Sequence, residues 1–135
     1  MSAENKELSR RFTELFSTGD EALADEVLAP DVVFHGTRGD GELHGLEEMK
    51  AFVKQYRRAF PDAHSTVEDQ VAEADTVVTR WRARGTHRGE IWGLPPTGNT
   101  VEWEFIDIFR VRDGKLVEHW THMDFEALRA QMRPR

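Results

Sequence analysis

An Asp113-Gly114 pair between two long alternating segments constrains the fold of this chain more than any other feature. Asp-Gly favours a two-residue turn with positive φ at both positions, which joins adjacent antiparallel strands. The hairpin strands are expected over 99–112 and 115–123. Two further alternating segments, 64–73 and 76–87, precede them. The second half of the chain is therefore predicted to be mostly antiparallel sheet.

Apolar residues recur at helical spacing in three segments of the first half. Capping and breaking residues set their limits: the first ends at Thr18-Gly19, Asp20 caps the second and Pro30 ends it, and the third runs from Leu46 to Phe60. A short strand at 32–35 and a glycine-rich loop at 36–45 are expected before the third helix. Helices followed by antiparallel strands predict an α+β fold, with helices on one face of a curved sheet.

The composition narrows the class of protein. Asp and Glu number 25 against 18 Lys and Arg, and the net charge of −7 argues against nucleic acid or an anionic membrane as partner. The chain has no cysteine, which excludes disulfides and thiolate metal sites. It also lacks an apolar run long enough for a membrane span and an apolar signal-peptide core. We expect one domain over 1–135, in a cytoplasmic protein.

Counting outward from a tight Asp113-Gly114 turn predicts the register of the hairpin. Arg112 then faces Lys115, and the next pairs are Phe109 with Glu118, Asp107 with Trp120, Phe105 with His122, and Trp103 with Asp124. Side chains alternate along a strand, so all of these share one face. Acids and histidine among aromatic residues predict the wall of a small-molecule pocket. The opposite face carries Ile106, Ile108, Val117 and Met123 and is expected to join two subunits in a homodimer.

Two neighbouring segments are expected to complete this pocket. Trp81 and His87 alternate inward along strand 76–87 and extend the aromatic wall. The Gly85–Gly98 loop carries Trp92 and the Pro95-Pro96 pair, as a segment that closes over a ligand does. Aromatic residues at period two also occur in ordinary cores, so a purely structural role for these tryptophans stays open.

Several motifs resemble the SnoaL-like polyketide cyclases, which belong to the cone-shaped nuclear-transport-factor-like superfamily. The matching residues are Phe60-Pro61-Asp62, Gly85-Thr86-His87 with Gly89, Gly93-Leu94-Pro95-Pro96-Thr97-Gly98, Phe109-Arg110-Val111, and Glu118-x-Trp120-x-x-x-Asp124 with Leu128 and Gln131. The resemblance itself covers essentially the whole chain. The resemblance implies a cone of N-terminal helices on a strongly curved antiparallel or mixed sheet.

The resemblance also implies a role for Asp124, since the aspartate of Trp-x-x-x-Asp is the acid/base group of an intramolecular aldol closure in these cyclases. A carboxylate in a dry pocket suits that chemistry. Asp124 also precedes Phe125-Glu126-Ala127, where an aspartate caps a helix. Both roles stay open.

Three further polar residues are candidates for the chemistry. His122 and Asp107, on the same predicted face, can orient the base or polarise a carbonyl, or form an ordinary buried polar pair. His35 ends the first strand beside the glycine-rich loop. His122 and Asp124 lack a third ligand at a recognisable spacing, so we expect no metal and no cofactor.

The sequence therefore predicts cofactor-independent acid/base catalysis on a hydrophobic, carbonyl-bearing small molecule, of the polyketide-cyclase (aldol) or isomerase type. The catalytic candidates are Asp124, His122, Asp107 and His35, and the substrate-binding candidates are Trp81, His87, Trp92, Trp103, Phe105, Trp120 and Glu118. A non-catalytic binding protein of the same fold is the alternative, and a hydratase or hydrolase relative, which needs a water held between two acids, is the third option.

Overall fold

The computed structural model describes residues 2–36 and 41–134, which form helices around one curved sheet. The first half of the chain contains α1 (Ser2–Thr18), α2 (Glu21–Val27), β1 (Leu28–His35), β2 (Glu42–His44) and α3 (Gly45–Ala59). The second half contains β3 (His64–Glu73), β4 (Thr76–Thr86), β5 (Thr100–Arg112), β6 (Lys115–Met123) and α4 (Phe125–Gln131).

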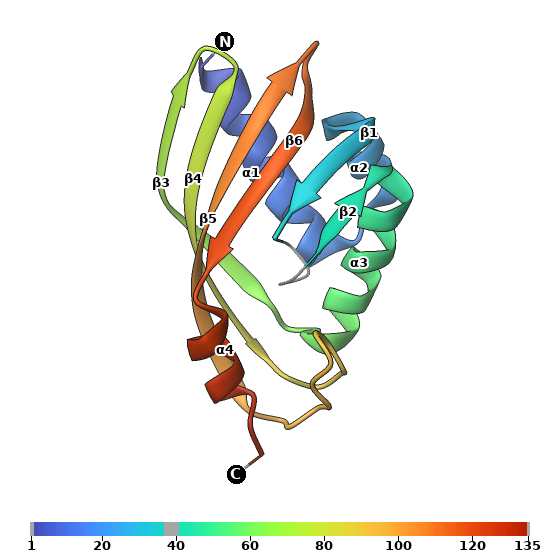
Figure 1. Ribbon diagram of the computed structural model, residues 1–135, viewed down its shortest axis with the longest axis vertical. Coiled ribbons are helices and arrows are strands. Elements are labelled where there is room, and N and C mark those ends of the chain that lie inside the picture. The colour runs from blue at the N-terminus through green and yellow to red at the C-terminus, as the bar shows by residue number, and fades with distance from the viewer. Residues whose placement is uncertain (1, 37–40, 135) are drawn as a thin grey trace.

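The strands follow the order β2-β1-β6-β5-β4-β3 in a six-stranded sheet. The pairs are antiparallel except for β1 and β6, which run parallel, so the sheet is mixed. In Figure 1 the long strands β3 to β6 curl around α1, while α3 lies beside β1 and β2. The sheet stays open, with β2 and β3 at its edges. The expected α+β cone with N-terminal helices on a curved mixed sheet is confirmed.

Apolar stripes and caps explain the helices. Phe12 and Leu15 are buried residues of α1, and the Phe12 ring packs on Phe34 and Phe109 of the sheet. Met49 and Tyr56 are buried on the apolar face of α3. Asp20 caps α2 as predicted, since its carboxylate accepts the amide N–H of Ala22 at 3.0 Å. Within the described residues, no helix has the length and apolar character needed to cross a membrane.

At the β2 edge the sheet is larger than the sequence predicted, because β1 is longer and β2 is an additional strand. β1 begins at Leu28 rather than at residue 32, and its pairing with β6 is irregular between Leu28 and Val33. Pro30 lies in this irregular stretch and is exposed, which is where a sheet tolerates proline. β2 occupies part of the segment that was expected to be loop, so that expectation is wrong for 42–44.

The hairpin turn forms as predicted, with φ of 52° at Asp113 and 75° at Gly114, and Arg112 faces Lys115. The next pair, Val111 opposite Leu116, also follows the predicted register, but the pairs beyond it do not. Arg110 lies opposite Glu118, so Val117 is an extra residue in β6.

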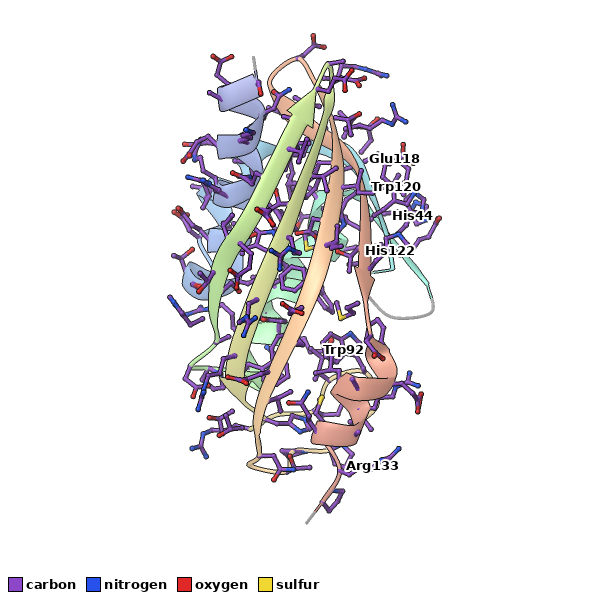
Figure 2. The ribbon with its side chains drawn as sticks, turned by 90° about the vertical axis from the view of Figure 1, so that its left-hand side faces the viewer. His44, Trp92, Glu118, Trp120, His122 and Arg133 are labelled. Atoms are coloured by element: carbon purple, nitrogen blue, oxygen red, sulfur yellow. The ribbon has the colours of Figure 1, made fainter. Side chains whose placement is uncertain are left out.

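This β-bulge exchanges the two faces of β6 for the rest of its length. Asp107 lies opposite Thr121 and Phe105 opposite Met123, so Thr121 and Met123 share the inner face with them. Figure 2 shows the consequence: Glu118, Trp120 and His122 lie on the side of the sheet that faces away from α1. The expectation that these three residues share a face with Asp107 is therefore wrong.

Candidate functional site

A cavity lies between α1, α3 and the concave face of β5 and β6, and aromatic side chains form most of its wall. Helices and the loop before β5 supply Phe12, Phe16, Phe52, Tyr56 and Trp92, and strands supply Trp103 and Phe105. Its volume is about 60 Å³. Apolar walls with few polar groups are typical of small-molecule sites.

Among the polar residues that line this cavity, Asp107, His119 and Thr121 form a hydrogen-bonded cluster. His119 Nε2 lies 2.7 Å from Asp107 Oδ1, and the Thr121 hydroxyl donates to the same oxygen. The Thr121 hydroxyl also lies 3.0 Å from His119 Nε2. Asp107 comes from β5, and the other two residues are alternate positions of β6, so the bulge brings the three together.

The cluster is deeply buried, and its hydrogen bonds are unevenly distributed. The side chains of Asp107 and His119 are each 2% exposed. Asp107 Oδ1 takes both hydrogen bonds, while Oδ2 and His119 Nδ1 have no hydrogen-bond partner among the described residues. A buried carboxylate oxygen without a donor destabilises the fold, and a role in binding or catalysis is one reason why such a group is found. Oδ2 is thus the oxygen of Asp107 that is left for a ligand.

The surroundings of His119 hold its ring in place. Its ring centroid lies 4.4 Å from that of Phe109, 5.2 Å from that of Phe34 and 5.6 Å from that of Phe12. A proton on Nε2 satisfies the bond to Asp107, and no carboxylate or carbonyl oxygen in the described residues accepts from Nδ1. His119 therefore acts as the donor that orients Asp107.

Tyr56 is another residue with a polar group that lines the same cavity. It lies on α3 and packs edge-on against Phe16, with the ring centroids 4.9 Å apart. Burial raises the pKa of its phenol well above the usual value, so the group stays protonated at neutral pH and can donate.

Trp92 reaches the cavity from the loop between β4 and β5 and lies close to α4 (Figure 2). Its backbone φ is 53°, a value that bulky residues rarely adopt, and Gly93 follows with 77°. The Trp92 ring packs edge-on against Phe125, with the centroids 5.4 Å apart. A strained backbone that directs a large side chain into a cavity is a feature of ligand sites.

His87, predicted to bind substrate, instead lies at the base of this loop. Its side chain is fully buried, and Nδ1 lies 3.0 Å from the Thr97 hydroxyl. The backbone closes the loop at the same point, since Gly98 N donates to His87 O at 2.7 Å. Burial lowers the pKa of His87 below its usual value. It does not line the cavity and holds the ends of the loop together.

His35 and Glu118 meet on the outer face of the sheet. His35 Nε2 lies 2.9 Å from Glu118, and Nδ1 lies 2.5 Å from Glu42 on β2. The imidazole also stacks on Trp120, with the ring centroids 5.3 Å apart. His35, Glu118, Trp120 and His122 were site candidates from the sequence, and none of the four lines the cavity.

Asp124 occupies the capping position that the sequence offered as its second role. Its carboxylate accepts the amide N–H of Ala127 at 3.0 Å, and the residue is exposed. It borders a shallow hollow between β5 and α4, apart from the cavity that Asp107 lines.

Of the remaining candidates, Trp103 and Phe105 line the cavity as predicted, while Trp81 lies beside Phe105 on the neighbouring strand β4 and does not line it. Sequence reasoning left out His119 and Thr121 because the straight register placed them on the outer face. Pairing of Glu118 with His35 on β1 is the signal that would have corrected this register, and it is not local in sequence. Within residues 2–36 and 41–134, no group of three or more His, Asp or Glu side chains is arranged to hold a metal ion.

Comparison with known proteins identifies the family to which the chain belongs. The family model of the SnoaL-like polyketide cyclases matches residues 6–132. The aklanonic acid methyl ester cyclase AcmA of Streptomyces galilaeus is 28% identical over 124 residues, covering 91% of this chain and 86% of AcmA.

Two solved structures are similar over nearly their whole length. TsrD from Streptomyces laurentii has a TM-score of 0.86 at 29% identity, covering 96% of this chain and 95% of TsrD. IdmH from Streptomyces antibioticus has a TM-score of 0.78 at 39% identity, covering 94% of this chain and 96% of IdmH. The resemblance inferred from the sequence motifs is thereby confirmed, and the chain belongs to the SnoaL-like polyketide cyclase family.

Proposed function

We propose that the protein closes a ring in a hydrophobic, carbonyl-bearing small molecule by an intramolecular aldol reaction, with Asp107 as the acid/base group and no cofactor. One observation carries the proposal: a buried carboxylate lines an aromatic cavity, with one oxygen held by His119 and Thr121 and the other unpaired. General bases need this combination of fixed orientation and a free lone pair.

The reaction needs one proton carrier. Asp107 Oδ2 takes a proton from the carbon next to a substrate carbonyl, and the C–H electron pair becomes the enolate. The enolate carbon then attacks a second carbonyl of the same molecule, a C–C bond forms, and that carbonyl oxygen becomes an alkoxide. Asp107 returns the proton to the alkoxide, so substrate and product are isomers. His119 and Thr121 hold Asp107 Oδ1 throughout.

The negative charge that develops on oxygen requires a donor as much as the carbon acid requires a base. Tyr56 fits this role because its protonated hydroxyl belongs to a residue that lines the same cavity. The aromatic wall excludes water, which strengthens such hydrogen bonds.

The relatives support the class of substrate. AcmA is named for aklanonic acid methyl ester, and the nogalonic acid methyl ester cyclase of Streptomyces nogalater is also related to this chain. A polyketide-derived aromatic ketone that carries an ester group is therefore the substrate class we propose. An isomerase would share the enolate step and omit the C–C bond.

The two other functions have less support. A binding protein without turnover needs no acid in its cavity, yet Asp107 is present and oriented. A hydrolase or hydratase needs a water held between two acids, and Asp107 is the one acid among the described residues that line this cavity.

The proposal includes a cytoplasmic homodimer formed by the outer face of the sheet. Ile106 is 39% exposed there, and Ile108 and Trp120 face each other across β5 and β6 on the same side. Met123, which the sequence placed on this surface, lines the cavity instead, so Trp120 takes its place in the proposed contact.

The test uses aklanonic acid methyl ester in D₂O, followed by liquid chromatography and mass spectrometry. Ring closure yields an isomer with a new retention time, and enolisation introduces deuterium next to the carbonyl even without closure. Asp107→Asn is expected to reduce both rates by at least about a hundredfold, the usual contribution of a general base.

Asp124→Asn is the matched control, because asparagine also caps helices and the surface position is unchanged. It should leave both rates within about threefold of wild type. The reverse result, with Asp107→Asn active and Asp124→Asn inactive, would assign the base to Asp124.

A further inference from the structure

A second hollow opens beside the cavity, between the C-terminal half of α1 and the strands β3 and β4. Its volume is about 380 Å³, and Thr13, Ser17, Ser65 and Trp81 are among the residues that line it. Thr13 and Ser65 also line the main cavity, so the two spaces adjoin. We call this hollow the Trp81 groove.

Trp81 lines this groove and carries a buried polar atom that has no hydrogen-bond partner among the described residues. The residue is 3% exposed, and its indole N–H has no acceptor among the described residues. An unsatisfied buried donor costs about 1–3 kcal/mol, and groups of this kind call for an explanation. Trp81 is paired with Phe105 across β4 and β5, with the ring planes 13° apart, and Phe105 lines the main cavity.

The attachment of α1 explains why the groove opens at this place. Side-chain hydrogen bonds join the N-terminal part of α1 to the sheet, from Ser9 to Thr79 at 2.9 Å and from Arg10 to Gln70 at 2.8 Å. In the described part of the chain, none joins α1 to β3 or β4 beyond Arg10. β3 also carries a bulge at Glu68, next to the residue that faces Trp81. Bulges are frequent beside ligand sites.

The size of the main cavity also indicates that a ligand would use the Trp81 groove. About 60 Å³ holds a few water molecules, whereas small-molecule pockets measure about 300–1,000 Å³. A multi-ring ligand therefore needs additional space, and the groove that adjoins the cavity at Thr13 and Ser65 offers it.

We propose that the Trp81 groove is a second ligand subsite, in which the indole N–H donates a hydrogen bond to a neutral carbonyl oxygen on a substituent of the ligand. This inference rests on the proposed function, which places the aromatic rings of that ligand in the main cavity. Arg10 and Glu14 both line the groove and carry opposite charges, and the indole donor is neutral. A ketone or ester oxygen therefore fits better than a carboxylate.

Two naphthalenes of similar shape test the subsite: methyl 2-naphthoate, which has an ester carbonyl, and 2-isopropylnaphthalene, which has no acceptor. Indole N–H signals of the four tryptophans are followed by ¹H–¹⁵N NMR during each titration. The Trp81 signal, identified by its loss in Trp81→Phe, should move downfield with the ester alone. The Trp103 signal should respond to both probes, because Trp103 lines the main cavity.

Trp81→Phe keeps the ring and removes the donor. It should weaken binding of the ester by about three- to tenfold and leave the hydrocarbon unaffected, as expected for the loss of one hydrogen bond. Trp120→Phe, on the outer face, should change neither affinity.

The outcomes separate the subsite from the proposed function. A response at Trp103 with none at Trp81, or an equal response of Trp81 to both probes, overturns the subsite and leaves the main cavity as a binding site. An unchanged ratio of affinities in Trp81→Phe also overturns it. The absence of any indole response overturns both proposals.

Discussion

His119 Nε2 and Asp107 Oδ1 lie 2.7 Å apart across two antiparallel strands, with both side chains 2% exposed. The two residues are not a directly opposed pair in the sheet, because Asp107 lies opposite Thr121 and His119 lies opposite Phe109. The hydrogen bond therefore runs diagonally, and Thr121 adds a second donor to the same oxygen. This arrangement fixes the carboxylate more firmly than a single bond does.

The diagonal bond predicts a strong energetic coupling. His119→Phe retains the volume of the ring but removes the donor, so it should lower the free energy of unfolding by about 1–3 kcal/mol. In a double-mutant cycle with Asp107→Asn, the coupling energy from urea unfolding should exceed about 0.5 kcal/mol. Additive effects would show that the two residues contribute independently.

The left-handed backbone at Trp92 predicts that a glycine variant is more stable than an alanine variant at this position, whereas glycine is usually the more destabilising of the two. Trp92→Ala and Trp92→Gly should both weaken binding of aromatic probes, because both remove the ring from the cavity. Trp92→Gly should nevertheless be more stable than Trp92→Ala by about 1 kcal/mol, since glycine adopts φ of 53° without steric cost.

Gly93→Ala is the control for this comparison. An added Cβ at Gly93 meets no atom within 4 Å, so its cost comes from the φ of 77° alone. Thermal unfolding should therefore show a lower Tm for Gly93→Ala than for wild type. An unchanged Tm would mean that the loop relaxes away from the left-handed conformation.

The contact of His35 with Glu118 and Glu42 predicts a pH dependence of stability. Hydrogen bonding to Glu118 is the largest cause that raises the pKa of His35, and Glu42 raises it further. The charged form therefore stabilises the fold fully below the unfolded pKa of about 6.5, and this contribution disappears as the pH rises through the higher folded pKa.

The measurement is Tm from about pH 5.5 to about pH 9 for wild type and His35→Gln. The wild type should be more stable at the acidic end, and the two curves should converge at the alkaline end. His44, which contacts Glu42 at 3.0 Å, is present in both proteins, so it does not produce the difference. If the Tm of the two proteins changed with pH in parallel, protonation of His35 would not contribute to the pH dependence of stability.

The proposed homodimer predicts a change of mass on substitution of its apolar surface. Light scattering at micromolar concentration should give twice the chain mass of 15.6 kDa for wild type. Ile106→Lys should shift the protein to the monomer, because a charge at a buried subunit contact is not compensated. Glu7→Lys, at an exposed position on α1 and so on the opposite side of the sheet, should leave the mass unchanged.

Much of the architecture follows from local sequence patterns. The periodicity that predicts α1, α3 and the four long strands is strong, and Asp113-Gly114 fixes the hairpin turn. β2 was missed because three residues next to glycines carry no period, and it is stabilised only by pairing with β1. Helix caps at Asp20 and Asp124 were also predictable, since they depend on residue type within one turn.

The candidate site depends on information that local patterns lack. Asp107, Trp103 and Phe105 precede the turn and were placed correctly relative to each other. His119 and Thr121 follow Val117, and one extra residue is enough to exchange the faces of β6. Phe12, Phe16 and Tyr56 were expected in helical stripes, but their place in the cavity wall depends on how the helices pack on the sheet.

Because of the bulge at Val117, the number of residues between the hairpin turn and a given position of β6 decides whether that side chain faces the interior. A slip of one position would replace His119, Thr121 and Met123 in the cavity with Glu118, Trp120 and His122. The same nine-residue strand thus holds two alternative sets of side chains for the interior, and its pairing with β5 and β1 selects one. For redesign of this fold, single insertions and deletions near the hairpin are accordingly a more direct route to new cavity chemistry than point substitutions.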